Sequence, residues 1–147
     1  MSLKHLNILL ADDDPDDCLF FKEALSGSVL TTHLTTVPDG EYLMEMLMNS
    51  TDAISDVLFL DLNMPRKNGF ECLTEIKQNN KLKKLPVVIF STSKAYDSIN
   101  VLFKTGADIY IRKPRDFNQL VQIIQHALPM TAENIPAKDK LKYILNA

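Results

Sequence analysis

The sequence has few cysteines and no long hydrophobic run, and each absence excludes a class of protein. Its 147 residues include two cysteines, Cys18 and Cys72, and no Cys/His pair has the spacing of metal ligands. A disulfide framework and a zinc site are therefore not supported, and two free thiols are expected. The apolar run after the N-terminus is too short for a signal peptide or a membrane span, and an acidic cluster ends it. We expect a soluble, cytoplasmic protein.

An excess of basic residues is also missing. The chain has 16 Lys and Arg against 19 Asp and Glu, and its formal net charge is −3. Nucleic-acid-binding domains usually carry a basic excess or a dense Lys/Arg stripe, so no such partner is predicted. Hydrophobic residues make up 46% of the chain, which is enough for one substantial core in a single domain. We expect that domain over residues 1–128, followed by a tail at 129–147 in which Leu141, Ile144 and Leu145 could form one short helix.

Five short apolar runs alternate with stretches of helical period. The expected strands are 6–10, 31–37, 56–60, 86–90 and 108–111. The expected helices begin near 15, 40, 69 and 117, and a further one, marked by Ile99, Leu102 and Phe103, ends at Gly106. The apolar residues expected to face the core from the second, third and last helices include Leu43, Met46, Leu47, Phe70, Leu73, Ile76, Phe117, Leu120 and Leu128. Five strand-then-helix units predict an α/β fold with a parallel sheet and helices on both faces.

In such open sheets the ligand site lies beyond the carboxyl ends of the strands. After the first strand come Asp12, Asp13 and Asp14, with Asp16 and Asp17 close behind. Acids so close together repel one another unless a cation is present, and Mg²⁺ prefers such oxygen ligands. The acids nearest the strand are expected to point into the site, and the later ones can face water at the helix start. Taken alone, the run could equally be a helix cap with a solvated acidic turn.

Single polar residues follow the third, fourth and fifth strands. Asp61 comes after the third strand and, beside Asp12 and Asp13, would complete a pocket of three carboxylates. A carboxylate beside a metal can accept a phosphoryl group. Ser91 offers a hydroxyl after the fourth strand, and Lys113 offers a compact cation for phosphate oxygens after the fifth. Each residue alone could be an ordinary loop residue, but together they predict a phosphoacceptor site.

At these positions the chain resembles the receiver domains of two-component response regulators, the CheY-like fold. The resemblance runs from about Leu6 to Leu128. The stretches that carry it are Ile-Leu-Leu-Ala-Asp-Asp-Asp-Pro at 8–15, Leu-Phe-Leu-Asp-Leu-Asn-Met-Pro at 58–65, Asn-Gly at 68–69, Pro-Val-Val-Ile-Phe-Ser-Thr at 86–92 and Gly-Ala-Asp-Ile-Tyr-Ile-Arg-Lys-Pro at 106–114. It implies a doubly wound, flavodoxin-like parallel sheet of five strands in the order 2-1-3-4-5.

The resemblance also implies a role for each site residue. Asp61 would become an aspartyl-phosphate, and Ser91 and Lys113 would contact the phosphoryl group. Mg²⁺ or Mn²⁺ would be held by Asp12, Asp13, Asp61 and the backbone carbonyl of Asn63. Ser91 and Tyr110 would form the conformational switch, and the Lys113–Pro114 bond would be cis.

The expected function is that of a stand-alone response regulator in a phosphorelay. A sensor histidine kinase or a histidine phosphotransfer protein would donate the phosphoryl group, and an unidentified protein would receive the signal. The chain would not be an enzyme beyond promoting its own phosphorylation and dephosphorylation. Two alternatives remain open: a haloacid-dehalogenase-like phosphatase using Asp12 and Asp14 with Lys113, and an unphosphorylated adaptor that keeps only the fold. The first leaves Asp61 without a role, and the intact set of site residues argues against the second.

Overall fold

The elements follow one another in the alternating order that the sequence predicts. The computed structural model describes residues 5–27, 31–50, 55–92, 96–132 and 144–145. The strands are β1 (His5–Ala11), β2 (Thr31–Val37), β3 (Val57–Leu60), β4 (Val87–Ser91), β5 (Ile109–Arg112) and β6 (Ile144–Leu145). The helices are α1 (Pro15–Ser26), α2 (Gly40–Asn49), α3 (Gly69–Gln78), α4 (Tyr96–Thr105) and α5 (Phe117–Ala132). Among these helices, none has the length and apolar character that crossing a bilayer requires.

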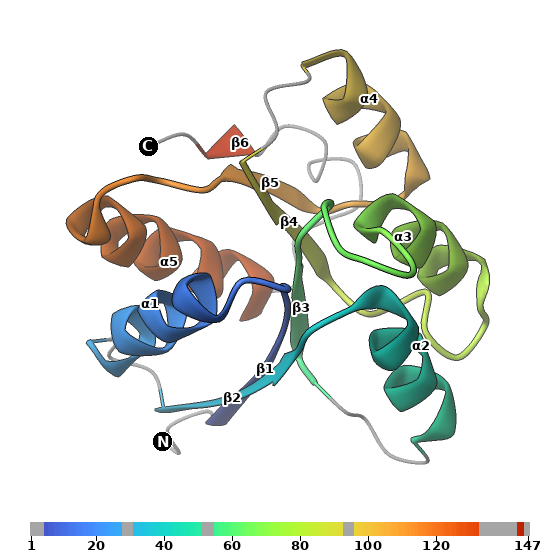
Figure 1. The fold of residues 1–147 in the computed structure, drawn as a ribbon, viewed down its shortest axis with the longest axis horizontal. Helices are drawn as coiled ribbons and strands as arrows, with labels where there is room; N and C mark the ends of the chain where they lie inside the picture. The colour runs from blue at the N-terminus through green and yellow to red at the C-terminus, as the bar shows by residue number, and fades with distance from the viewer. Residues whose placement is uncertain (1–4, 28–30, 51–54, 93–95, 133–143, 146–147) are drawn as a thin grey trace.

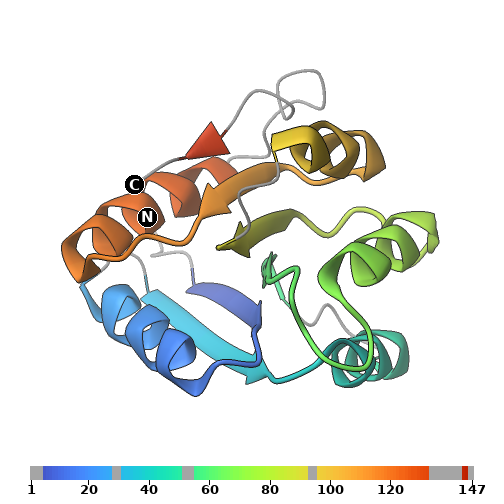
Figure 2. The ribbon, with the colours of Figure 1, turned by 45° about the horizontal axis from the view of Figure 1, so that its top comes forward.

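All strands of the sheet are parallel, in the order β2-β1-β3-β4-β5-β6. Helices α1 and α5 cover one face, and α2, α3 and α4 cover the other (Figure 1). Figure 2 shows the same three layers after a turn of the molecule. The doubly wound sheet with strand order 2-1-3-4-5 is therefore confirmed. Because every strand runs the same way, the carboxyl ends of β1, β3, β4 and β5 lie at one edge of the sheet.

The sheet separates two hydrophobic cores, and successive residues of a strand enter them alternately. In β1, Leu9 and Ala11 belong to the core under α2, α3 and α4, whereas Ile8 and Leu10 belong to the core under α1 and α5. All four residues of β3 are buried, as are all five of β4. This double burial explains the continuous apolar runs that mark these strands in the sequence.

Two residues expected in the core are exposed, and a third is only partly buried. Phe70 is 41% exposed, because the buried positions of α3 begin at Gly69 and repeat at the following i+3, i+4 and i+7 positions, which Phe70 does not share. Phe117 is also 41% exposed, since it is the first residue of α5. In α2, Leu43 and Leu47 are buried as expected, but Met44 is buried in place of Met46, which is half-buried and packs against the core.

The region after Leu128 also differs from the expectation. Helix α5 continues through Pro129 to Ala132, although the loss of one helical hydrogen bond at a proline suggested an earlier end. Ile144 and Leu145 form strand β6 beside β5 instead of part of a helix, and Leu141 lies outside the described residues. A free strand edge offers unpaired N–H and C=O groups, and a β-branched residue such as Ile144 suits a strand. The domain division at residue 128 stays a prediction.

Candidate functional site

Two buried aspartates stand at the carboxyl ends of neighbouring strands. Asp12 follows β1 and is 2% exposed, and Asp61 follows β3 and is 4% exposed. Their backbones continue the sheet pairing: the Asp12 N–H donates to the Val37 carbonyl, and the Asp61 N–H donates to the Ala11 carbonyl, both at 3.0 Å. The register of the sheet therefore sets both side chains side by side.

Each of these carboxylates is fixed by one backbone donor and one cation. Asp12 Oδ1 accepts the Asp14 N–H at 3.0 Å, and Asp61 Oδ1 accepts the Asn63 N–H at 3.2 Å. The other oxygens face the Lys113 ammonium, with Nζ 2.8 Å from Asp12 Oδ2 and 3.3 Å from Asp61 Oδ2. Three of the four carboxylate oxygens thus accept hydrogen bonds, whereas Asp12 Oδ2 has only the ion pair with Lys113 and no hydrogen-bond partner.

Lys113 reaches the acids from the loop after β5. Its N–H donates to the Ser91 carbonyl at 3.0 Å, so its backbone is tied to the end of β4. The side chain is 9% exposed, and Nζ lies 5.6 Å from the centroid of the Phe90 ring, within the range of a cation–π contact. No peptide bond in the described part of the chain is cis, so the expected cis bond at Lys113–Pro114 is absent. The trans form is the ordinary preference of such bonds, and Lys113 reaches the acids with it.

A third acid, Asp17, contacts the same ammonium. Asp17 Oδ2 lies 2.8 Å from Lys113 Nζ, as close as Asp12 Oδ2 does. The sequence analysis placed the later acids of the run in water, which is wrong for Asp17. Pro15 begins α1, so Asp17 lies in the first helical turn and faces the sheet edge. Nothing in the sequence distinguishes Asp17 from the neighbouring Asp16 as a partner of Lys113.

In this cluster, burial and ion pairing shift the pKa values of the charged groups in opposite directions. Burial raises the pKa of Asp12 to about 6, against the lowering effects of Lys113 and the Asp14 N–H. Burial lowers the pKa of the Lys113 ammonium, but its contacts with Asp12 and Asp17 outweigh that effect and raise the pKa above its usual range. Lys113 is therefore charged at neutral pH, and the raised pKa of Asp12 brings a change of its charge close to neutrality.

Affinity for a divalent cation is expected to fall as the pH decreases through 6. A carboxylate must be ionised to bind a cation, and Asp12 takes up a proton below its raised pKa of about 6. Each pH unit below that value should weaken Mg²⁺ binding about tenfold, whereas an ordinary aspartate would hold its affinity to about pH 4. Isothermal titration calorimetry at pH 7.5, 6.5 and 5.5 measures this dependence. An affinity unchanged down to pH 5.5 would contradict it.

Without a bound cation, the raised pKa of Asp12 makes its contribution to the stability of the folded protein larger at low pH than at neutral pH. The native state holds the Asp12 proton more tightly than the unfolded chain does, because its pKa is raised from 3.8 to about 6. This contribution to stability is fully present below about pH 4 and is lost as the pH rises through 6.

Three carboxylates have the spacing of a metal site. Asp12, Asp13 and Asp61 each present one oxygen, and these oxygens lie within 4.8 Å of one another. Asp13 is exposed, so the cluster opens to solvent on one side. Oxygen ligands on one open side suit a hard divalent cation that keeps some of its waters. Asn63 stands two residues after Asp61, is exposed, and contacts the cluster through its backbone N–H, which donates to Asp61 Oδ1.

The two residues expected to act as a switch are both buried. Ser91 is the last residue of β4 and is 0% exposed. Tyr110 lies in β5 opposite Ile89 of β4 and Ile144 of β6, and it is 3% exposed within the core under α2, α3 and α4. Tyr110 was expected on the fifth strand, whereas Ser91 was expected just after the fourth strand and is instead its last residue. The movement of both residues stays a prediction.

The loop after Asp61 packs too closely for a side chain at Gly69. A Cβ at this position would overlap the Asp61 carbonyl oxygen and lie 2.8 Å from Leu62 Cα. The Gly69 N–H also donates to the Leu62 carbonyl at 3.0 Å. Asn68 caps α3 through a reciprocal capping box with Glu71, which fixes where the helix begins. Helix α3 is thus held directly against the backbone of Asp61.

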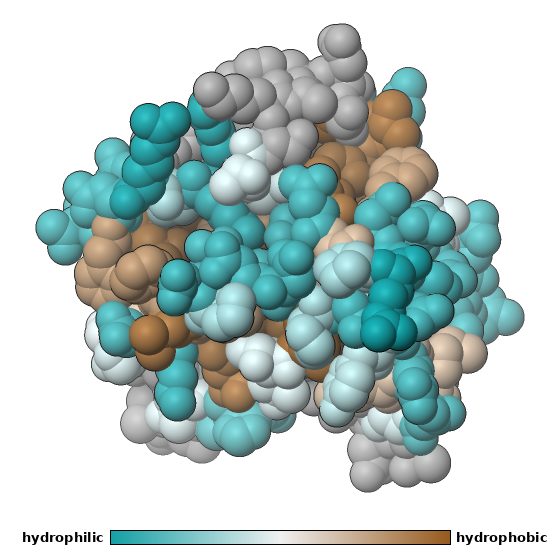
Figure 3. Space-filling view, in the orientation of Figure 1, coloured by the Kyte–Doolittle hydropathy of each residue, from teal (hydrophilic) through white to brown (hydrophobic). Residues whose placement is uncertain are grey.

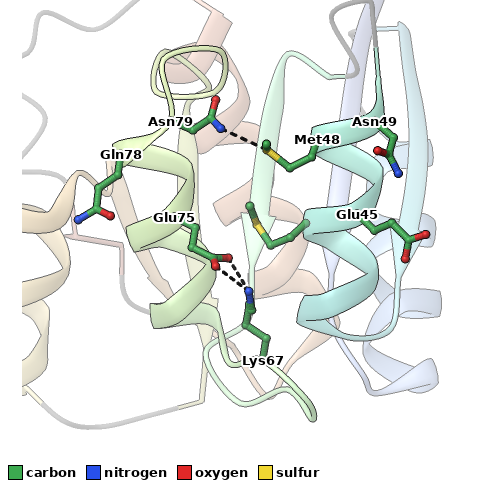
Figure 4. A pocket seen from close by; sticks show the side chains of 8 residues that line it. Glu45, Met48, Asn49, Lys67, Glu75, Gln78 and Asn79 are labelled. Atoms are coloured by element: carbon green, nitrogen blue, oxygen red, sulfur yellow. Dashed lines mark hydrogen bonds and ion pairs between the residues drawn. The ribbon is translucent and has the colours of Figure 1, made fainter.

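A separate groove of about 470 Å³ lies between α2 and α3 (Figure 4). Met44 and Met48 line it together with polar residues, the Lys67–Glu75 ion pair has a length of 2.7 Å, and Asn79 approaches the Met48 sulfur. None of the acids that surround Lys113 lines this groove. It therefore belongs to the packing of two helices and not to the acidic cluster.

The face of the molecule in Figure 3 is mainly polar, with apolar side chains gathered over α1 and α5 and over α4. The exposed apolar residues there are Leu19, Phe20, Phe117 and Val101.

Comparison with known proteins identifies the same architecture. The family described as the response regulator receiver domain matches residues 8–125. The response regulator Rcp1 of Synechocystis sp. is 33% identical over 122 residues, which is 80% of this chain and 83% of Rcp1. The DNA-binding transcriptional regulator NtrC of Escherichia coli strain K12 is 31% identical over 121 residues, or 82% of this chain, but the match spans only 24% of NtrC.

Two solved structures are similar over most of their length. The phosphorylated cyanobacterial phytochrome response regulator RcpA superimposes with a TM-score of 0.82 at 33% identity, covering 90% of this chain and 98% of RcpA. The Mn²⁺-bound form of Rcp1 superimposes with a TM-score of 0.79 at 30% identity, covering 89% of this chain and 97% of the Rcp1 chain.

Proposed function

The chain belongs to the response regulator receiver domain family, and from that membership we propose that it accepts a phosphoryl group on Asp61 from a histidine kinase or a histidine phosphotransfer protein. The observation that carries the proposal is the meeting of Asp12, Asp61 and the Lys113 ammonium at one sheet edge. An isolated pair of buried acids would be unfavourable, and a site that receives a phosphoryl group requires both metal ligands and a cation.

Asp61 is the proposed nucleophile. One of its carboxylate oxygens attacks phosphorus, the bond from phosphorus to the donor's imidazole nitrogen breaks, and the imidazole leaves with the electron pair. Asp12, Asp13, Asp61 and the Asn63 carbonyl would hold Mg²⁺ or Mn²⁺, which neutralises charge on the phosphoryl oxygens. Lys113 supplies a second positive charge, already within 3.3 Å of Asp61. The neighbouring charges thus favour the anionic group that the reaction adds.

Ser91 and Tyr110 are proposed to carry the change of state to the surface. The phosphoryl group adds about −1.5 to −2 charges and three strong acceptors, which attract the Ser91 hydroxyl at the end of β4. Tyr110 lies in the adjacent strand, so a shift at the end of β4 changes the space beside its ring. The surface formed by α4, β5 and α5 would then present a different face to a protein partner.

A mass measurement tests the proposal. The intact protein is incubated with acetyl phosphate and Mg²⁺, and a parallel sample contains EDTA. We expect a labile, phosphate-sized gain in mass that EDTA abolishes. No gain, with Mg²⁺ binding shown separately by calorimetry, would support the adaptor reading. Release of phosphate from phosphate esters without any gain in protein mass would support the phosphatase reading instead.

The family membership also supports a proposal about the partners and the cellular location of the protein. Receiver domains signal by binding proteins, so a downstream protein target is proposed and no nucleic-acid contact is. A cytoplasmic location is likewise proposed, since histidine kinases present their phosphorylated domains there.

A further inference from the structure

Asp17 stands in the phosphoacceptor cluster without a role in the function proposed above. Lys113 Nζ has three N–H donors and three carboxylate neighbours: Asp12 and Asp17 at 2.8 Å, and Asp61 at 3.3 Å. Charge-assisted hydrogen bonds of this type usually measure about 2.7–2.9 Å. The hydrogen bond to Asp17 is therefore at full strength, and the one to Asp61 at 3.3 Å is weaker. Asp12 Oδ2 is held by charge alone, because its contact with the ammonium lacks hydrogen-bond geometry.

Asp17 contacts the Lys113 ammonium from α1, whereas the other two acids contact it from the ends of strands. Asp12 and Asp61 end neighbouring strands, whereas Asp17 projects from the first turn of α1. The Asp17 side chain is 33% exposed, in contrast to 5% for Asp61. Removal of Asp17 would leave the ammonium with one donor free and only two buried acids as protein partners, so it would move towards Asp61.

We propose that Asp17 is a positioning residue that shares the Lys113 ammonium and thereby keeps it from pairing closely with Asp61. A closely paired Asp61 would be a weaker nucleophile and a poorer cation ligand, because the ammonium would occupy the oxygen that both functions use. The inference rests on the proposed function for its effect on phosphoryl transfer. The effect of Asp17 on cation binding does not depend on phosphoryl transfer. An experiment can therefore contradict the positioning role of Asp17 and the proposed function independently.

The chain offers a close control for Asp17. Asp16 is the preceding residue, it is also in the first turn of α1, and it is exposed. The N–H groups of both residues donate to Asp14 Oδ1, at 2.9 Å from Asp16 and 3.4 Å from Asp17. Asp16→Asn and Asp17→Asn therefore remove the same charge from the same helix end, but only the second removes a Lys113 partner.

The experiment measures Mg²⁺ affinity by calorimetry at pH 7.5 for the wild type and both variants. Asp17→Asn should weaken Mg²⁺ binding about threefold to tenfold more than Asp16→Asn, the scale of one charge-assisted hydrogen bond to a part-exposed group. Equal effects of the two substitutions would overturn the proposal, since charge at the helix end would then explain both. The rate of mass gain with acetyl phosphate should fall in the same order.

A double-variant comparison tests whether Asp17 acts through Lys113. In a Lys113→Met background, Asp17→Asn and Asp16→Asn should have the same effect on Mg²⁺ affinity, because the shared ammonium is gone. A difference that persists without Lys113 would overturn the proposal, since Asp17 would then act on the cation directly. If the wild type binds Mg²⁺ but never gains phosphate, the proposed function fails and the affinity comparison still decides the role of Asp17.

Discussion

Replacing Asp61 with Asn is expected to reduce the phosphate-sized mass gain to background while the protein stays folded. The amide has nearly the same shape, and its oxygen can still accept the Asn63 N–H that Asp61 Oδ1 accepts at 3.2 Å. An amide nitrogen carries no lone pair available for attack on phosphorus, so the proposed nucleophile is lost. Removal of one charge from the cluster should also lower the pKa of Asp12 towards its ordinary value, since Asp61 is one cause of the elevation.

The matched control is Asp56→Asn. Asp56 precedes the same strand, β3, at the opposite edge of the sheet, where it is exposed and accepts the Asn7 N–H at 2.7 Å. The two variants lose the same charge from opposite ends of one strand. Asp56→Asn should gain phosphate as the wild type does. A gain that persists in Asp61→Asn would place the acceptor elsewhere and contradict the proposed function.

Lys113→Met is expected to cost about 3–5 kcal/mol of the free energy of unfolding at pH 7.5 without Mg²⁺, the usual effect of removing one partner from a buried ion pair. Its ammonium neutralises part of the charge of Asp12, Asp17 and Asp61, and its side chain is 9% exposed. The methionine fills similar space, so the lost charge accounts for the change. Urea denaturation measures it, and Lys22→Met on the exposed face of α1 is the control.

Two conditions should reduce this loss. At pH 5 Asp12 is protonated, because its pKa in the wild type is about 6 and rises further without the cation, so less repulsion remains. Saturating Mg²⁺ stabilises both native states by mass action, and it should stabilise the variant more, because it replaces the positive charge that the acids have lost. A loss below about 1 kcal/mol at pH 7.5 would contradict the prediction, because it would equal the effect of an exposed pair.

The fold was predictable because the strands carry strong local signals. Runs such as 57–60 are apolar at every position, and only a strand covered on both faces buries all of them. Some helix residues were harder: Phe70 and Phe117 have the residue type of the core, but Phe70 lies off the buried stripe of α3 and Phe117 is the first residue of α5. β6 was not predictable, because its two residues gain their partner from β5, far away in the sequence.

The site was predictable in its members but not in all of its contacts. Asp12, Asp61 and Lys113 follow strands directly, so sheet geometry alone brings them to one edge. Asp17 projects from a helix, and its contact with Lys113 depends on how α1 packs against the sheet. A run of similar acids does not distinguish the member that faces the site from Asp16, which faces water.

Strand β6 has a practical consequence for the design of reporters. It pairs in parallel with β5, with Ile144 opposite Tyr110 and Leu145 opposite Ile111. The chain at Leu145 therefore points towards the sheet edge that carries Lys113. A fluorescent protein or affinity tag fused after this strand would start beside that edge, whereas a label on exposed Met48 of α2 would sit on another face. Labels at the α2 position are thus the safer choice for following the switch without disturbing it.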